Sequence, residues 1–205
     1  MTVVEFHVSV VYLWNRRAPL SDQPPLCPLA SPALRSVARW WLTTYTPGRL
    51  PSRTEIDLSA IRHALPYVWL VEHIADDDTF RYRLAGEHVN EVFGYSLRGK
   101  RLADIIEPHM REIVRTRFLH ALNTPGVVYA VGRVYMRIGG YREGERLILP
   151  LSDDGVNGTH LFGVTDYGRG RRDDWENPPE YMDERFLEID DVLDWRAALG
   201  VPDGS

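Results

Sequence analysis

Cysteine is almost absent from this chain, since Cys27 is its single thiol among 205 residues. One thiol cannot form an internal disulfide, so we expect a protein of the reducing cytoplasm. No apolar run approaches the length that crosses a bilayer, which argues against a membrane span. Acidic residues outnumber lysine and arginine by 29 to 24, which gives a formal net charge of −5. This acidic balance argues against a nucleic-acid surface, which needs a basic face.

Motifs of the common catalytic sites are also missing. The sequence has no glycine-rich loop ending in Lys-Ser or Lys-Thr, no Gly-x-Ser-x-Gly, no His-Glu-x-x-His and no cysteine pair. The carboxylates of Asp76, Asp77 and Asp78 could crowd around a metal ion, but at a hairpin tip Asp is typically a solvated turn former. The histidines show no i, i+4 spacing of a metal pair. We therefore expect neither an enzyme nor a metal site.

What is present fits one globular domain with extra segments at both ends. Hydrophobic residues make up 44% of the chain and charged residues 26%, and the length suits a single full core. Residues 1–30 are predicted to be an N-terminal extension followed by a proline-rich linker. The opening MTVVEFHVSVVYLW has its arginines after the apolar residues, which is the reverse of a signal peptide. It is either a strand or a poorly ordered extension.

Residues 31–66 are predicted to form flanking helices. Ser31 is a suitable N-cap, and Pro32 suits the first helical position. A second short helix, which carries Ile61 and Leu65, is expected before the chain enters the sheet.

Residues 67–168 have the pattern of an antiparallel sheet. An apolar strand at residues 67–74 is joined by the acidic turn to a strictly alternating strand. On that second strand the apolar set is Phe80, Tyr82 and Leu84, and the charged set on the opposite face is Arg81 and Arg83. Short helical turns and the longest helix, which begins at Pro108, follow. Three more strands are expected at residues 127–138, 146–151 and 160–166.

The spacing of small and polar residues after the hairpin resembles the pattern of PAS sensor domains. The pattern consists of Asn90, Gly94-Tyr95, Gly99-Lys100, Asp104 and Pro108. The stretches LPSRTEID, ALPYVWLVE and FRYRLAG are similar, more narrowly, to a bacterial single-PAS family of about this length. The resemblance covers residues 31–167. It implies an α+β fold in which a five-stranded antiparallel sheet wraps around short helices, with one long helix on one face.

Residues 169–205 are predicted to be a polar linker followed by an acidic amphipathic helix around residues 179–199. One helical stripe of this segment would carry Met182, Phe186, Ile189 and Leu193. Such a helix either folds back on its own sheet or docks in the groove of a partner.

A cavity between the inner sheet face and the long helix is the candidate ligand site. Its predicted lining is Tyr82, Asn90, Phe93, Ile105, Ile113, Val134, Met136, Leu149 and Phe162. A concave apolar pocket with few polar groups is typical of small-ligand sites. Alternatively, these side chains fill the space as ordinary core.

Two cofactors of PAS domains can be weighed against the sequence. A haem would need a histidine of the long helix pointing into an apolar pocket. His120 flanks the apolar stripe of that helix and His109 lies in its first turn, so haem is disfavoured and remains a remote alternative. The flavin photochemistry of light-sensing PAS domains needs a cysteine in the helical segment. Cys27 lies in the linker, which argues strongly against that chemistry.

The sequence as a whole predicts a cytoplasmic sensory or signalling module without an output domain of its own. It would bind a small apolar ligand, a signalling-protein partner, or both. The alternative is a pure interaction domain with a filled core and no ligand. The flanking helix also predicts a homodimer, because aromatic residues are enriched at interface cores. The candidate interface residues are Val37, Trp40, Trp41 and Tyr45.

Overall fold

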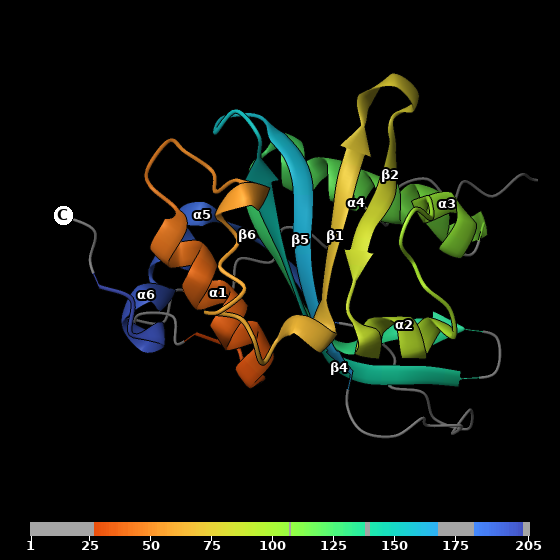
Figure 1. Ribbon diagram of the computed structural model, residues 1–205, viewed down its shortest axis with the longest axis horizontal. Coiled ribbons are helices and arrows are strands. Elements are labelled where there is room, and N and C mark those ends of the chain that lie inside the picture. The colour runs from red at the N-terminus through yellow and green to blue at the C-terminus, as the bar shows by residue number, and fades with distance from the viewer. Residues whose placement is uncertain (1–26, 107, 138–139, 168–182, 203–205) are drawn as a thin grey trace, which may run out of the picture.

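An antiparallel sheet of six strands, in the order β2-β1-β5-β4-β3-β6, organises the computed structural model (Figure 1). The structure describes residues 27–106, 108–137, 140–167 and 183–202. Most of the predicted N-terminal extension and most of the polar linker lie outside the described residues. In the part of the chain that is described, no helix is both long and apolar enough to cross a membrane.

The five predicted strands are present, and a sixth follows them. The strands are β1 (Val68–Ile74), β2 (Thr79–Ala85), β3 (Gly126–Arg137), β4 (Gly140–Ser152), β5 (Gly158–Tyr167) and β6 (Asp183–Glu188). The α-helices are α1 (Pro32–Thr44), α2 (Glu87–Phe93), α3 (Leu102–Ile105), α4 (Arg111–Asn123), α5 (Ile189–Leu193) and α6 (Trp195–Leu199). Short 3-10 turns are η2 (Arg53–Glu55), η3 (Leu65–Tyr67), η4 (Ala75–Asp77) and η5 (Pro108–Met110). The α+β class is therefore correct, and the five-strand count is one strand too low.

Helix α1 begins where the sequence predicts. The Ser31 hydroxyl accepts hydrogen bonds from the backbone N–H groups of Ala33 and Leu34, and Pro32 occupies the first turn. The prediction of a second flanking helix is wrong. Residues 58–64 form a series of turns, and the Asp57 carboxylate accepts from the N–H groups two and three residues later without starting a regular helix.

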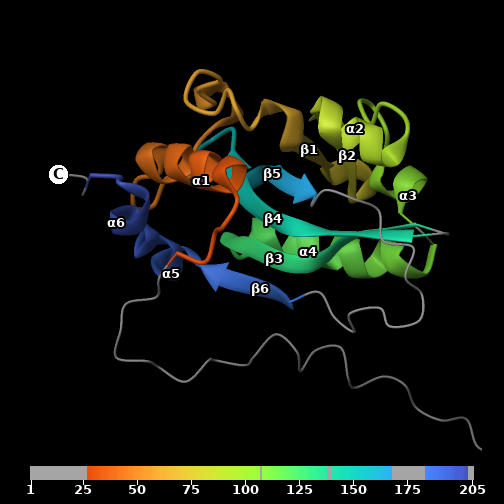
Figure 2. The same ribbon diagram turned by 90° about the horizontal axis from the view of Figure 1, so that it is seen from below.

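The sheet has a core on each face. The inner-face core lies toward α2, α3 and α4 and includes Trp69, Phe80 and Phe118. The outer-face core lies toward α1, α5 and α6 and includes Trp41 and Trp195. Figure 2 shows α1 and α4 on opposite sides of β4. Both faces of the central strands are thus buried, because alternate side chains of a strand point to opposite faces.

The C-terminal segment is a strand and two short helices, which corrects the prediction of one amphipathic helix. Residues 183–188 pair with the free edge of β3, where Val127 lies opposite Leu187 and Val128 lies opposite Phe186. Pairing satisfies the backbone groups of an otherwise open edge, so tertiary context overrides the helical pattern. The end of the chain then folds back on α1, since Arg196 donates to the backbone oxygens of Leu42 at 2.8 Å and Tyr45 at 3.3 Å.

A β-bulge in the β1–β2 hairpin changes the predicted faces of β2. Leu70 lies opposite Leu84, whereas the next residue, Val71, lies opposite Tyr82, so Arg83 is an extra residue. Phe80 and Tyr82 stay on the inner face as predicted. Leu84 moves to the outer face, where its side chain is 39% exposed.

We predict that Trp195→Ala will destabilise the fold by about 3 to 5 kcal/mol, because the indole is buried in the outer-face core. The neighbouring Asp194 is exposed, so Asp194→Ala should leave the free energy of unfolding nearly unchanged. Urea denaturation of both variants measures the difference. Equal stability of Trp195→Ala and wild type would show that the C-terminal helices do not belong to the core.

Candidate functional site

Aromatic side chains fill the inner face of the sheet. Trp69, Phe80, Tyr82 and Phe118 are all less than a tenth exposed. The Trp69 ring stacks on Phe118 with centroids 5.8 Å apart, and Phe80 meets Phe118 edge-to-face at 5.1 Å. Gly163 allows this packing, because a Cβ atom there would overlap the Trp69 indole. Among the described residues, the inner face is thus a packed core.

Polar groups of the inner face are bonded to one another. The Thr165 hydroxyl accepts from Trp69 Nε1 at 3.0 Å and from Arg146 Nε at 3.2 Å. Arg146 also donates to the backbone oxygen of Val134. Arg146 is a half-buried charge that the sequence pattern did not predict. Arg146 lies between Glu145 and the apolar residues 147–149, and this context does not indicate that its side chain points toward the inner face.

An ion pair joins the inner-face helix α4 to the sixth strand, β6. Arg117 of α4 contacts Glu184 of β6 at 2.9 Å. Burial raises the pKa of Glu184, and the nearby cations Arg117 and Arg146 oppose this rise. The pair fixes α4 to a strand that the sequence alone does not predict.

The predicted ligand-cavity residues fall into separate places. Tyr82, Phe93 and Val134 are buried in the inner-face core, and Ile105 packs against it. Ile113 of α4 is half-buried, and Met136 lies in β3, with its side chain outside the described part. Leu149 and Phe162 belong to the outer-face core, so their inclusion is wrong. The reason is the two-residue period of a strand: Ile148 takes the inner position beside Leu149.

Asn90, the predicted cavity amide, serves as an internal clamp. Its Nδ2 donates to the Ala85 backbone oxygen at 3.0 Å, and its Oδ1 accepts from the Leu97 N–H at 2.9 Å. Both ends of the amide therefore join the end of β2 to the loop after α2. The phenol of Tyr82 is buried as well, and burial raises its pKa.

The predicted dimer-interface residues face their own sheet. Val37, Trp40 and Trp41 are at most 5% exposed. The two indoles donate to backbone oxygens, Trp40 to Glu55 and Trp41 to Pro150, each at 3.0 Å. Tyr45 is half-buried and stacks on Trp41 with ring centroids 5.0 Å apart. The folded chain does not offer these indoles as an interface, so a homodimer would need another surface.

We predict that Trp41→Ala will lower the free energy of unfolding by about 3 to 5 kcal/mol and leave the oligomeric state unchanged. Thr43→Ala, at an exposed position of the same helix, is the matched control and should change neither quantity. Urea denaturation and light scattering measure the two effects. A folded Trp41→Ala protein that turns from dimer to monomer would contradict the packing role.

Helix α1 does not extend over the outer face of β1 and β2 (Figure 1), where Val68 and Leu70 are buried but Leu84 is partly exposed. An apolar groove of about 430 Å³ runs between this face and the segment that follows α1. The segment contributes Leu58, Ile61 and Leu65, and the sheet contributes Leu70, Leu84 and Phe162. We call this feature the leucine groove. Leu58 is 60% exposed and Leu84 is 39% exposed, which is a large apolar area to leave in water.

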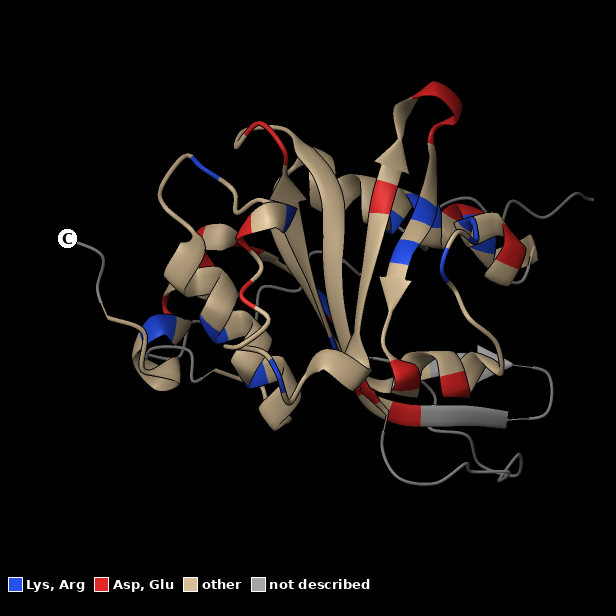
Figure 3. Cartoon of the chain, viewed as in Figure 1, with Lys and Arg blue, Asp and Glu red and all other residues tan. Residues whose placement is uncertain are grey.

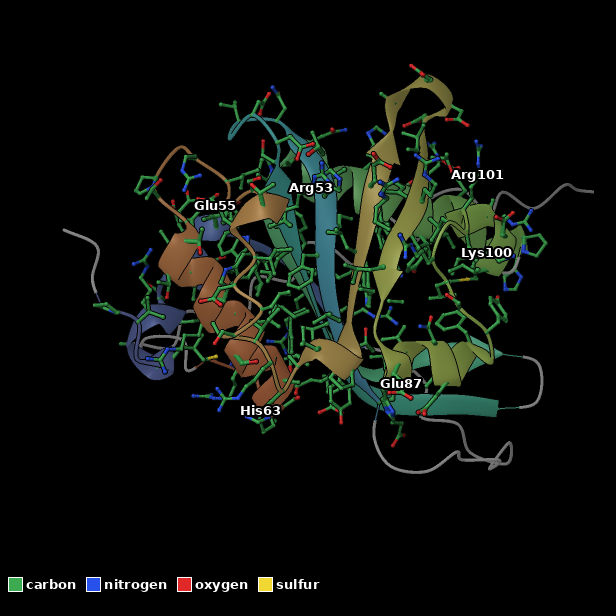
Figure 4. All side chains as sticks on the ribbon, in the orientation of Figure 1. Arg53, Glu55, His63, Glu87, Lys100 and Arg101 are labelled. Atoms are coloured by element: carbon green, nitrogen blue, oxygen red, sulfur yellow. The ribbon has the colours of Figure 1, made fainter. Side chains whose placement is uncertain are left out.

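Arginines border the same face. Arg53 lines the leucine groove and pairs with Asp153 at 3.3 Å. Figure 3 shows positively charged bands on β2. Figure 4 shows Arg53 on one side of β1 and β2, with Lys100 and Arg101 on the other. On β2 itself, Arg81 and Arg83 share one carboxylate, Glu72 of β1, at 3.0 and 3.5 Å.

A smaller pocket of about 270 Å³ lies at β2. It is lined by Arg81, Tyr82, Arg83, Arg98 and Gly99. We call it the arginine pocket. The loop that carries Arg98 is held to the strand by backbone hydrogen bonds between Gly99 and Tyr82 at 2.8 Å and between Tyr82 and Lys100 at 2.9 Å.

Residues weighed for cofactors lie apart from both of these sites. Cys27 packs against the outer-face core, on the opposite side of the sheet from α4, and burial raises its pKa. His120 lies against Phe186 with ring centroids 4.1 Å apart, and His109 is exposed in η5. No group of three metal-ligating side chains occurs within the described ranges. The acidic turn makes ion pairs instead, Asp77 with Arg101 and Asp78 with Arg115.

His160 is a titratable group buried on the outer face of β5, where it lies opposite Glu72 of β1. Burial lowers its pKa below the usual 6.5, and the nearby Arg53 and Arg83 lower it further. Asp153 and Glu72 oppose the shift. Because the folded state disfavours the charged ring, the unfolded chain binds the proton first as pH falls.

We therefore predict that the free energy of unfolding decreases as pH drops from 6.5 toward the lowered pKa of His160. His160→Gln should remove this part of the pH dependence, whereas His63→Gln, at an exposed position, should not. Urea denaturation across that pH window gives the comparison. Parallel curves for wild type and His160→Gln would contradict the prediction.

Comparison with known proteins gives a family match. A family model described as PAS domain matches residues 29–166. One matching solved structure is described as "Structure of an RNA-binding Light-Oxygen-Voltage Receptor". It is 19% identical, with a TM-score of 0.37, and the match covers 60% of this chain and 37% of the receptor chain. No curated protein matches the sequence.

Proposed function

The chain belongs to the PAS domain family, whose members are generally sensory or interaction modules, and we propose that it signals by binding a partner protein in the leucine groove. The observation that carries this proposal is the contrast between the two sheet faces. The inner face is filled by aromatic side chains, whereas the outer face leaves Leu58, Leu65 and Leu84 exposed around one groove. A small apolar ligand between the sheet and α4 would have to displace this core, so a protein partner is the better-supported occupant.

The groove favours an amphipathic segment as the occupant. Its floor is apolar, from Leu70 and Phe162, and its two sides are formed by different parts of the chain. An amphipathic helix laid in such a groove buries apolar anchors at a spacing of three to four residues. Arg53 at the groove and Arg81 and Arg83 on β2 outnumber their two carboxylate partners, Asp153 and Glu72, so acidic residues should flank the anchors.

Partner binding in the leucine groove would also explain how this chain transmits a signal. Residues 53–65 form one side of the groove and join α1 to the first strand. This segment consists of short turns, and the Ser52–Glu55 capping box is its local support. A partner that prefers one arrangement of the segment shifts the population toward that arrangement.

The test places a photo-crosslinking amino acid at Leu58 or Leu84 of the full chain in its native cells. Mass spectrometry then identifies the crosslinked partner. We predict that the purified partner binds wild type, and that Leu84→Glu weakens binding at least tenfold, because a desolvated carboxylate would face apolar anchors. Isothermal titration calorimetry measures the affinity.

Val156 provides the matched control, because its side chain is 67% exposed and does not line the groove. A crosslinker at Val156 should not capture the partner, and Val156→Glu should bind it as wild type does. Equal loss of affinity in Val156→Glu and Leu84→Glu would sink the proposal. So would a partner that binds Leu84→Glu normally.

A further inference from the structure

Three guanidinium groups converge on the arginine pocket. Arg81 and Arg83 come from β2, and Arg98 comes from the loop before α3. They line one space of about 270 Å³, which is separate from the leucine groove. Like charges this close repel one another, so their convergence costs free energy unless an anion offsets it.

The carboxylates around the pocket do not balance this charge. Glu72 is shared between Arg81 at 3.0 Å and Arg83 at 3.5 Å. Arg98 forms no ion pair with any residue that the structure describes, and neither does Lys100, two residues later. Arg101 is neutralised separately by Asp77. Three cations against one carboxylate leave about two positive charges at the pocket.

Arg81 has unused hydrogen-bonding capacity as well. Its Nη2 donates to Glu72, but its Nε is buried and has no partner among the described residues. A buried N–H without an acceptor costs free energy, so a small shift of the guanidinium that brings this Nε to an oxygen ligand would be favourable. The guanidinium fork also matches the oxygens of phosphate and carboxylate in bidentate geometry.

From this geometry we propose that the arginine pocket binds a phosphoryl group. A phosphate monoester carries nearly two negative charges at neutral pH, which balances the excess charge of the pocket. The volume is below the usual range of pockets for drug-sized ligands, so the ester carries only a small organic group. The phosphoryl group belongs either to a free small ester or to a phosphorylated side chain of a protein. This site does not depend on the proposed groove function.

Two charge changes of opposite sign test the site. Isothermal titration calorimetry of the full chain uses inorganic phosphate, glycerol 2-phosphate and a phosphoserine peptide as probes. Arg98→Gln should weaken binding about tenfold, because one charged donor is lost. Glu72→Gln should strengthen it, because Arg81 and Arg83 are released from their shared carboxylate. Melting temperatures measured alongside show whether each variant is folded.

Each variant has a control with the same charge change elsewhere. Arg62→Gln is the control for Arg98→Gln, because Arg62 is exposed and does not line the pocket. Asp76→Asn is the control for Glu72→Gln, because Asp76 is exposed at the hairpin tip. Neither should alter the affinity. Leu58→Glu, which disables the leucine groove, should also leave phosphate binding intact and so separates the two proposals.

The results identify the source of the phosphoryl group and test whether the arginine pocket binds it. Binding of the free esters assigns the pocket to a small metabolite, and binding of the phosphoserine peptide alone assigns it to a modified protein. The proposal is overturned if no probe binds at millimolar concentration. It is also overturned if Arg98→Gln and Arg62→Gln weaken binding equally, since the effect would then be one of overall charge.

Discussion

Burial of β4 and β5 on both faces is the constraint on which the rest of the structure depends. On β4, Leu147 and Leu149 lie on the outer face and Ile148 lies on the inner face. Both faces must therefore pack against helices to keep these side chains out of water. The helices α4 and α1 supply these covers from opposite sides (Figure 2). The Trp41 indole fixes the outer cover through its hydrogen bond to the Pro150 oxygen. The aromatic residues of α1 are therefore part of the core of the folded chain.

The outer cover reaches only part of the sheet, and this incompleteness creates the candidate site. Helix α1 lies over β4 and β5 and does not extend over β1 and β2 (Figure 1). The bulge at Arg83 then directs Leu84 to the uncovered face. An apolar groove on a sheet whose other face is rigidly packed is a suitable docking surface, because the partner meets a preformed shape and little order is lost on binding.

Strand β2 contributes to both proposed sites. Its Leu84 lines the leucine groove, while Arg81 and Arg83 line the arginine pocket. The opposite edge of the sheet is closed by β6, which pairs with β3 and is tied to α4 by the Arg117–Glu184 ion pair. This added strand lies beyond the residues that match the PAS domain family. Both candidate sites therefore lie at the β2 side of the sheet.

Local sequence patterns determined much of this fold. The alternation around Phe80 and Tyr82, the Ser31 cap and the glycine spacing of the PAS pattern are short-range signals, and the corresponding elements are present. Contacts between distant segments decided the rest. Residues 183–188 became a strand because β3 offers an open edge, and Leu84 changed face because of one extra residue opposite β1. The leucine groove and the arginine pocket join residues from separate segments, so no single stretch of sequence could show them. Side-chain periodicity is encoded locally, whereas the choice of neighbour depends on which surfaces remain unburied once the chain has folded.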